Sequence, residues 1–283
     1  MPIAFFCTMP YVFIYKAVRS SSSKITRRTH RFEMKRYAFD QVLYQPGKIC
    51  RTCQFLKPAR SKHCNICNMC IAKHDHHCVW LMNCLGKGNY IYFLGLLASL
   101  GIMLNYGTFI AHNILLHTLQ SDFQKYSHSD QKGRKWSVDL TWGSYFDAWT
   151  RTISQNYRIG SVGLLTLFIG PLAWVLFVYH TYLIWAGMTT NESAKWADWR
   201  DDIVAGVVVK KEKPIPQINN NIERPDLEES LYFFDRPGDD AFSDAWIKDR
   251  WASGWKKVES LDEMHNLYDL GFTNNLRDVL DTG

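Results

Sequence analysis

Residues 50–84 read CRTCQFLKPARSKHCNICNMCIAKHDHHCVWLMNC and contain seven of the eight cysteines in the chain. Two units with the same spacing, C-x2-C-x9-H-x6-C, overlap in this stretch with an offset of fourteen residues. Three thiolates and one imidazole are a common ligand set of structural zinc sites, and a C-x2-C step lets one tight turn supply two ligands. The sequence therefore predicts two Zn²⁺ sites that interleave along the chain: Cys50, Cys53, His63 and Cys70 form the first set, and Cys64, Cys67, His77 and Cys84 form the second.

One cysteine of the stretch, Cys78, belongs to neither set. Leu81 stands where a further C-x2-C step would need its second cysteine, and Asp75 and His76 come shortly before the thiol. A neighbouring imidazole can take the proton of a thiol, and a carboxylate can orient that imidazole and stabilise its charged form. We therefore expect Cys78 to be a nucleophile, with His76 as its general base and Asp75 as the group that orients His76.

The motif Asp75-His76-His77-Cys78 in this cysteine-rich frame resembles the DHHC protein S-acyltransferases, or palmitoyltransferases. Lys57-Pro58-Ala59-Arg60 and Asn83-Cys84-Leu85-Gly86, followed by Asn89, match the same family. Val79 departs from it, because most members have proline there, although some fungal and animal branches carry Val or Ile. KPARSKHC followed by GKGNY is most similar to the fungal branch that acylates SNARE proteins near their membrane anchors.

The resemblance implies a two-step transfer of a palmitoyl group. Cys78 would accept the acyl chain from palmitoyl-CoA and pass it to cysteine thiols of membrane-anchored, SNARE-like proteins. The family uses the positions of Lys57, Arg60 and Lys62 to bind the phosphates of CoA; the alternative is that these three residues are solvated surface charges. The branch resemblance places the protein in the membrane of the endoplasmic reticulum, with the Golgi as an alternative.

Two segments near the end of the chain also match family elements. Thr189-Thr190-Asn191-Glu192 is by itself a plausible helix cap. In the resembled family a TTxE motif at this place braces the DHHC site, and the expected contact joins Thr190 to Asp75. Residues 266–275, which include Asn275, resemble a C-terminal element that packs back on the acyltransferase core.

The apolar segments predict an α-helical polytopic membrane protein, a transmembrane helix bundle with a cytosolic cysteine-rich domain. Hydrophobic residues make up 47% of the chain. Residues 89–112 and 161–187 are long enough to span a membrane, which takes about 20 apolar residues. Residues 1–18 are shorter; the resembled family typically has four spans, so either upstream residues are missing or one span has been lost. The expected division is 1–18, transmembrane helix; 19–49, cytosolic basic linker; 50–88, zinc domain; 89–112, transmembrane helix; 113–160, luminal loop; 161–187, transmembrane helix; and 188–283, cytosolic C-terminal region.

The net charge of +6 fits a protein at an anionic membrane surface. The basic residues of 19–49 lie beside an apolar segment, and such residues mark the cytosolic side. We expect the lipid bilayer as a partner and no nucleic acid, because the aromatic residues lie in apolar runs and do not alternate with basic residues. Trp196 and Trp199 are expected at the membrane surface.

Two other classes of protein fit part of the pattern. A zinc-stapled binding module or membrane adaptor would need both metal sites but no nucleophile, so that Cys78 would be a spare ligand. A ubiquitin ligase with a cross-braced zinc domain also interleaves its ligands, but its usual ligand spacings differ and it needs no orphan cysteine. Acyl labelling that depends on Cys78 separates the enzyme from both.

Overall fold

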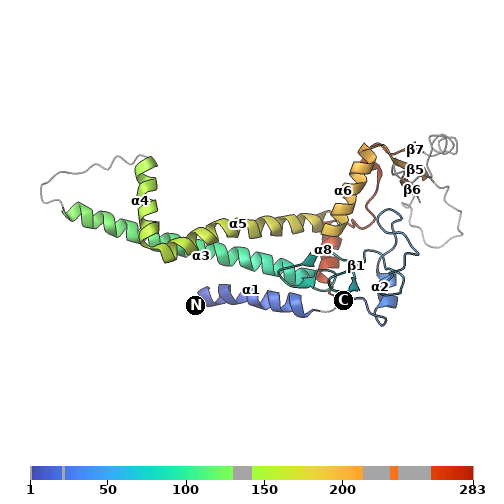
Figure 1. Cartoon of the computed structure of the whole chain (residues 1–283), viewed down its shortest axis with the longest axis horizontal. Helices are drawn as coiled ribbons and strands as arrows, with labels where there is room; N and C mark the ends of the chain where they lie inside the picture. The colour runs from blue at the N-terminus through green and yellow to red at the C-terminus, as the bar shows by residue number, and fades with distance from the viewer. Residues whose placement is uncertain (1, 21–22, 130–141, 213–229, 235–255, 283) are drawn as a thin grey trace. The chain divides into compact units, whose positions relative to one another are not determined.

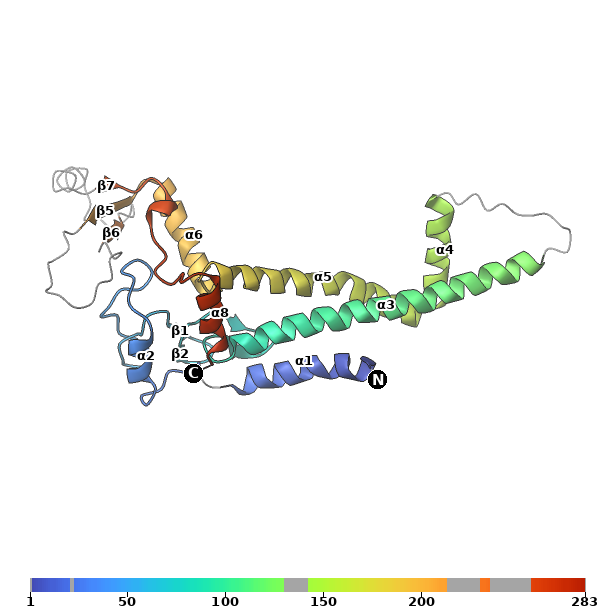
Figure 2. The ribbon, with the colours of Figure 1, turned by 180° about the vertical axis from the view of Figure 1, so that it is seen from behind.

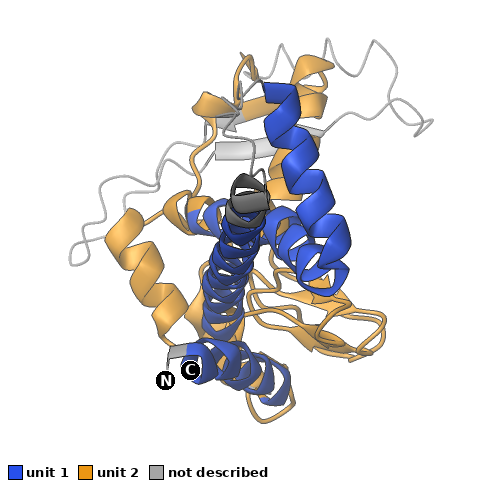
Figure 3. Cartoon of the chain, turned by 90° about the vertical axis from the view of Figure 1, so that its left-hand side faces the viewer, with its two compact units in different colours: residues 1–19, 91–181 blue, residues 20–90, 182–283 orange. Residues whose placement is uncertain are grey.

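The computed structural model describes residues 2–20, 23–129, 142–212, 230–234 and 256–282. The chain divides into two compact units, which are described separately (Figures 1 and 3): unit 1 is Met1–Arg19 with Ile91–Thr181, and unit 2 is Ser20–Tyr90 with Tyr182–Gly283. The elements are, in chain order, α1 (Pro2–Arg19), α2 (His30–Arg36), β1 (Lys62–Cys64), β2 (Met69–Ile71), β3 (His77–Cys78), β4 (Asn83–Cys84), α3 (Tyr90–Ser129), α4 (Trp142–Gln155), α5 (Tyr157–Trp185), α6 (Thr190–Val204), β5 (Val208–Glu212), β6 (Ser230–Phe234), β7 (Lys256–Lys257), η1 (Leu261–Glu263) and α8 (Phe272–Leu280).

In unit 1, α1, α3 and α5 run side by side (Figures 1 and 2). Phe6 of α1 packs its ring 5.1 Å from that of Tyr106 in α3. Thr108 of α3 donates a hydrogen bond to Thr166 of α5 at 2.9 Å between the two Oγ1 atoms. Small residues let helices in a membrane approach closely, and a Cβ added at Gly163 of α5 would lie only 2.9 Å from Cβ of Ala111 in α3.

Within the part of the chain that the structure describes, two helices are long and apolar enough to cross a membrane: Tyr90–Asp122 of α3, and α5. They contain most of the predicted spans 89–112 and 161–187. Residues 2–18 of the predicted segment 1–18 do form a helix, as part of α1, but it is not one of these two, so its role as a span stays a prediction. Within residues 113–160, which we expected as a luminal loop, α3 continues to Ser129, and α4 and the start of α5 are also helical. Residues 130–141 lie outside the described residues, and the luminal position stays a prediction.

In unit 2, the fourteen-residue repeat folds as two copies of one antiparallel hairpin. In the hairpin of β1 and β2, His63 stands opposite Cys70, and in that of β3 and β4, His77 stands opposite Cys84. The partners are the last two ligands of each predicted metal set. Because paired positions in a hairpin lie within about 6 Å of each other, the strands bring the imidazole and the thiol together.

The core of unit 2 is a cluster of buried apolar side chains from α6, β5 and distant parts of the chain. They include Val42, Tyr44, Trp196, Trp199 and Tyr268. β5 pairs antiparallel with β6 on one side and with β7 on the other. Our expectation that Trp196 and Trp199 lie at a membrane surface is wrong, since both are buried in this core. Both side chains lie on the face of α6 that packs into this core, which accounts for two large apolar side chains at these positions.

Candidate active site and metal centres

The structure gathers the two predicted ligand sets into two separate clusters. In each cluster the ligand atoms all lie within 4.8 Å of one another. The Nδ1 atom of the histidine faces the sulfurs in both. The distances from Nδ1 of His63 are 3.5 Å to Sγ of Cys50, 3.4 Å to Cys53 and 3.8 Å to Cys70; those from Nδ1 of His77 are 3.7 Å to Cys64, 3.4 Å to Cys67 and 3.6 Å to Cys84.

These spacings fit a tetrahedral metal ion. Zinc–sulfur and zinc–nitrogen bonds of about 2.3 and 2.0 Å at a tetrahedral angle put sulfur and nitrogen roughly 3.5 Å apart. Each of the clusters therefore has the donor atoms, the number of ligands and the spacing of a Cys3His site. Among the described residues, Cys78 belongs to neither cluster.

The turn that carries Cys78 is a third copy of the turn that carries the metal ligands. Gln54, Asn68 and Met82 follow one another at intervals of fourteen residues, and all three have a left-handed backbone, with φ of 56°, 52° and 47°. In the first two turns the amide nitrogens of Cys53 and Cys67 donate to the sulfurs of Cys50 and Cys64. Left-handed backbone costs a residue with a Cβ roughly 1–2 kcal/mol, so its repetition reflects a fixed turn geometry.

In the third turn, the backbone N–H groups of Leu81 and Trp80 donate to the sulfur of Cys78. Burial alone would raise the pKa of the Cys78 thiol, but the hydrogen bond from His76 and these two backbone donors outweigh it and lower the pKa. Leu81 is buried where the metal-binding turns have their second cysteine. The turn thus keeps the anion-stabilising amides of a metal-binding turn and lacks the second thiol.

His76 is held between Asp75 and Cys78. Nδ1 of His76 lies 2.6 Å from Oδ2 of Asp75, and the ring also hydrogen-bonds Cys78. Because Nδ1 must donate its proton to the carboxylate, the lone pair of Nε2 is left for the thiol proton. Burial alone would lower the pKa of His76, but the hydrogen bonds to Asp75 and Cys78 raise it to about 9. The pair is therefore suited to hold a thiolate beside an imidazolium.

Asp75 is itself fixed by α6. The backbone N–H of Thr190 donates to Oδ1 of Asp75 at 2.7 Å, and the hydroxyl of Thr190 donates to Oδ2 at 2.9 Å. This is the contact that we expected from the TTNE motif. A capping box at the start of α6, in which Thr189 and Glu192 bond each other's backbone N–H groups, sets the position of Thr190.

Arg60 is buried and paired within unit 2, so its expected contact with a CoA phosphate stays a prediction. Its guanidinium donates to both carboxylate oxygens of Glu192, at 2.7 Å from Nε and 2.5 Å from Nη2, and to the carbonyl oxygen of Gly187 at 3.1 Å. The rings of Tyr37 and Tyr268 lie near the guanidinium carbon, at 5.2 and 4.5 Å. Burial alone would raise the pKa of Glu192, but the charge of Arg60 lowers it. Arg60 therefore ties the KPAR stretch to the TTNE motif.

The other two predicted phosphate ligands differ from Arg60. Lys62 is exposed, and its ammonium group donates to Oδ1 of Asn191 at 2.9 Å, within the TTNE motif. Lys57 is partly exposed, and its backbone N–H bonds the carbonyl of Lys48. Both can meet an anion from the solvent.

The C-terminal element contacts the end of α5 through Asn275, and its expected role in supporting the acyltransferase core stays a prediction. The side-chain amide of Asn275 donates to the carbonyl of Trp185 at 3.3 Å and to Oδ1 of Asp269 at 2.8 Å, while its oxygen accepts from the backbone N–H of Leu270 at 2.9 Å. Gly187 needs its positive φ of 64° here, and a Cβ added to it would clash with the backbone of Asp269.

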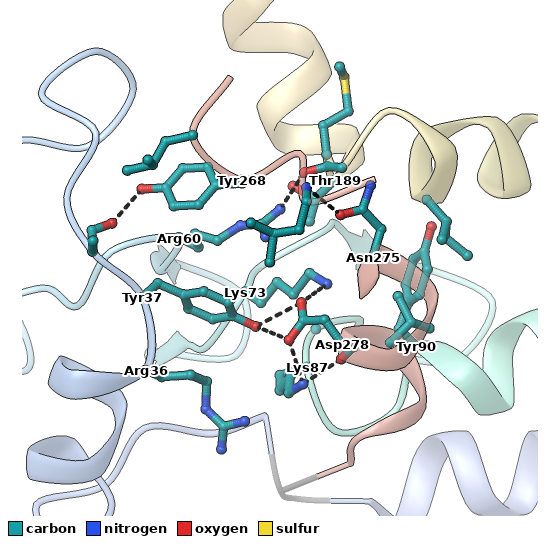
Figure 4. Close-up of a pocket in the computed structure, with 18 residues that line it drawn as sticks. Arg36, Tyr37, Arg60, Lys73, Lys87, Tyr90, Thr189, Tyr268, Asn275 and Asp278 are labelled. Carbon is teal, nitrogen blue, oxygen red and sulfur yellow. Dashed lines mark hydrogen bonds and ion pairs between the residues drawn. The ribbon is translucent and has the colours of Figure 1, made fainter. Parts of the chain in front are cut away.

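An ion cluster that we did not predict is centred on Asp278 of α8, which lines a cavity of about 400 Å³ in unit 2 (Figure 4). Asp278 accepts from Nζ of Lys73 at 2.6 Å, from Nζ of Lys87 at 2.9 Å and from the hydroxyl of Tyr37 at 2.9 Å. Lys87 also bonds the backbone carbonyl of Asp278. Burial alone would raise the pKa of Asp278, but the two ammonium charges hold it well below its usual value. These partners are 191 or more positions away in the chain.

Known proteins resemble the chain over the same elements. The model of the DHHC palmitoyltransferase family matches residues 43–197. Palmitoyltransferase swf1 of Aspergillus fumigatus is 41% identical over an alignment 298 positions long, gaps included, which covers 96% of this chain and 75% of that protein. Palmitoyltransferase SWF1 of Neurospora crassa is 35% identical, and the alignment covers 98% of this chain and 66% of that protein. Palmitoyltransferase ZDHHC4 of Mus musculus is 33% identical, and the alignment covers 66% of this chain and 53% of that protein.

Proposed function

Because the chain belongs to the DHHC palmitoyltransferase family and is therefore a protein S-palmitoyltransferase, we propose that Cys78 carries the acyl group between donor and acceptor. The donor is palmitoyl-CoA, and the acceptors are cysteine thiols of membrane-anchored proteins. One observation supports this role above the others. Cys78 is outside both metal-binding sets, yet it has the turn and the amide donors of a metal-binding cysteine and the Asp75–His76 pair beside it.

In the first step, Nε2 of His76 takes the proton of the Cys78 thiol, and the thiolate attacks the thioester carbon of palmitoyl-CoA. A new carbon–sulfur bond forms to Cys78, the bond to the sulfur of CoA breaks, and the CoA thiolate receives the proton from His76. Asp75 stabilises the imidazolium during this exchange and is kept in place by Thr190. The amides of Leu81 and Trp80 stabilise the negative sulfur.

In the second step, the thiol of the acceptor protein loses its proton to His76 and attacks the acyl carbon on Cys78. The Cys78 thiolate leaves and is reprotonated, so the enzyme returns to its first state. One thioester replaces another in both steps, so the reaction is nearly balanced in free energy. Orientation of the two sulfurs is what the site supplies, and in well-aligned systems orientation lowers a barrier by as much as roughly 7–11 kcal/mol.

Two Zn²⁺ ions in the two Cys3His sets would be structural. A structural zinc ion contributes folding free energy and fixes the hairpin that holds it. The set of Cys64, Cys67, His77 and Cys84 flanks Cys78 on both sides in the sequence and thereby fixes the ends of its turn. Lys57 and Lys62 would bind the phosphates of CoA as exposed point charges.

The chain is a multi-pass bundle with its zinc domain in the cytosol, where thiols stay reduced. Its acceptors are SNARE-like proteins with cysteines near their membrane anchors, and its compartment is the endoplasmic reticulum, with the Golgi as the alternative. The resemblance of KPARSKHC and GKGNY to the fungal branch that acylates SNARE proteins supports both, and the Swf1 relatives are fungal palmitoyltransferases.

Acyl labelling of cysteine variants tests the proposal. Purified protein in detergent is incubated with an alkyne analogue of palmitoyl-CoA, and the adduct is detected after coupling to a dye. We expect a hydroxylamine-sensitive adduct that is lost in Cys78→Ala and kept in Cys7→Ala. An adduct of undiminished intensity in Cys78→Ala would overturn the catalytic role, and the zinc-stapled adaptor would then explain the fold.

A further inference from the structure

Unit 1 contains a cavity of about 380 Å³ between α4 and the neighbouring parts of α3 and α5. Its wall is almost entirely apolar and aromatic, with contributions from Leu115 of α3, Phe146 and Trp149 of α4, and Leu164 and Leu167 of α5. Pockets that bind small molecules have volumes of roughly 300–1,000 Å³ and are mostly apolar. Among the described residues that line this cavity there is no carboxylate, lysine or arginine, although His112 is part of the wall, so a strongly charged ligand is a poor fit.

The helix that covers the cavity has the pattern of an interfacial helix. Trp142, Tyr145, Phe146, Trp149 and Ile153 recur at intervals of three, four and seven residues and form one face of α4, as the 3.6-residue period requires. Trp142 is 86% exposed and Phe146 is 73% exposed, although both are large and apolar. Aromatic rings of this kind are enriched where a membrane meets water.

The direction of α4 agrees with this pattern. Within unit 1, α4 lies steeply across the long axes of α3 and α5, as two opposite views show (Figures 1 and 2). α3 and α5 contain the two segments that are apolar enough to span a membrane. A helix that crosses two spans at a steep angle lies along the membrane surface, with its apolar face toward the hydrocarbon. The cavity is then at the level where lipid chains begin.

The cavity wall continues into the exposed apolar surface of α5. Leu164 and Leu167 line the cavity, yet they remain 40% and 48% exposed. Neighbouring large apolar side chains on α5 are also exposed, among them Leu165, Phe168 and Leu172. A lipid chain lying along α5 can therefore enter the cavity from the side.

From these features we propose that the cavity binds one acyl chain of a membrane phospholipid, with its headgroup beside the amphipathic helix α4. The gain on binding is not hydrophobic, since the chain leaves an equally apolar bilayer. It comes from van der Waals contacts, which the wall of an empty cavity would lack. The acyl chain itself needs no hydrogen-bond partner, and the hydroxyl of Thr108 at the cavity is already bonded to Leu104 and Thr166. The buried indole N–H of Trp149 has no partner among the described residues, and it can donate to an ester carbonyl of the same lipid.

Photolabelling in a bilayer tests the proposal without any measurement of transferase activity. The full chain is placed in nanodiscs of phosphatidylcholine that contain a trace of phosphatidylcholine with a diazirine in one acyl chain. After irradiation, labelled peptides are mapped by mass spectrometry. We expect the label to concentrate on residues that line the cavity, such as Leu115 and Phe146, above the general labelling of the α5 surface.

Two matched substitutions on α5 decide the outcome. Leu164→Trp fills the cavity and should reduce cavity labelling about tenfold, equivalent to ~1.4 kcal/mol. Leu165→Trp adds the same bulk at a neighbouring site that is 58% exposed and outside the cavity, and should leave the labelling unchanged. Uniform labelling along α5 that neither substitution alters would overturn the proposal. A diazirine sterol that labels the cavity and is not displaced by excess phosphatidylcholine would overturn it as well.

Discussion

Glu192→Gln should destabilise the protein far more than its small change in shape suggests. Glu192 accepts hydrogen bonds from Nε and Nη2 of Arg60, the hydroxyl of Tyr44 and the backbone N–H of Thr189. The amide keeps the size of the side chain, but it removes the negative charge and turns one acceptor toward Arg60 into a donor. Arg60 is then a buried charge without a counter-ion, and breaking a buried ion pair in this way costs about 3–5 kcal/mol.

Thermal unfolding of the solubilised protein, followed by intrinsic fluorescence, measures this cost. A loss of 3–5 kcal/mol at roughly 2–4 °C per kcal/mol lowers the midpoint by about 6 to 20 °C. Glu263→Gln is the matched control, because Glu263 pairs with Lys210 at 2.5 Å but remains accessible to solvent. Such surface pairs contribute less than about 1 kcal/mol. Equal shifts for the two variants would refute the conclusion that the buried Arg60–Glu192 pair holds the TTNE motif in place.

Three further variants have specific expected outcomes. Thr190→Val removes one hydrogen bond to the Asp75 carboxylate, which is worth about 1.5–3 kcal/mol, so the rate of acyl-enzyme formation should fall tenfold or more while the zinc content stays the same. Cys70→Ala should lower the metal content from two zinc ions per chain to one, measured by inductively coupled plasma mass spectrometry, because each ligand serves one set only. Asp278→Asn should lower the thermal midpoint, since it removes the carboxylate that pairs with Lys73 and leaves Lys87 only its longer ion pair with Asp281 at 3.4 Å, whereas the exposed Asp262→Asn should not.

Local spacing was enough to predict the ligand sets and the position of Cys78, because a tight turn fixes which residues face the same point. Because Leu81 stands where a C-x2-C step would need its second cysteine, the sequence indicated that the turn of Cys78 binds no metal. The structure adds that this turn keeps the left-handed residue at Met82 and the amide donors to the sulfur. A one-dimensional pattern carries no information on backbone donors, so they could not be predicted.

Contacts between distant segments were the part that sequence reasoning missed. Arg60 stands in a basic stretch and looks like a surface charge, but its counter-ion is 132 positions away. Lys73 and Asp278 are 205 positions apart. Thr190 was the exception, because the resemblance of its motif to the TTxE element supplied the long-range contact. The amphipathic pattern of α4 was readable in the sequence, but its polar residues led us to treat the segment as a loop.

The most direct test is a single-turnover reaction with purified protein, one equivalent of palmitoyl-CoA and an acceptor with a membrane-anchor cysteine. Samples are quenched in acid over time, and each acylated cysteine is identified by tandem mass spectrometry. If the Cys78 sulfur carries the chain, palmitoyl-Cys78 appears before the acylated acceptor and decays at the rate at which that product forms. Acceptor acylation with no palmitoyl group on Cys78 at any time, or with the group on Cys7 instead, would contradict the account.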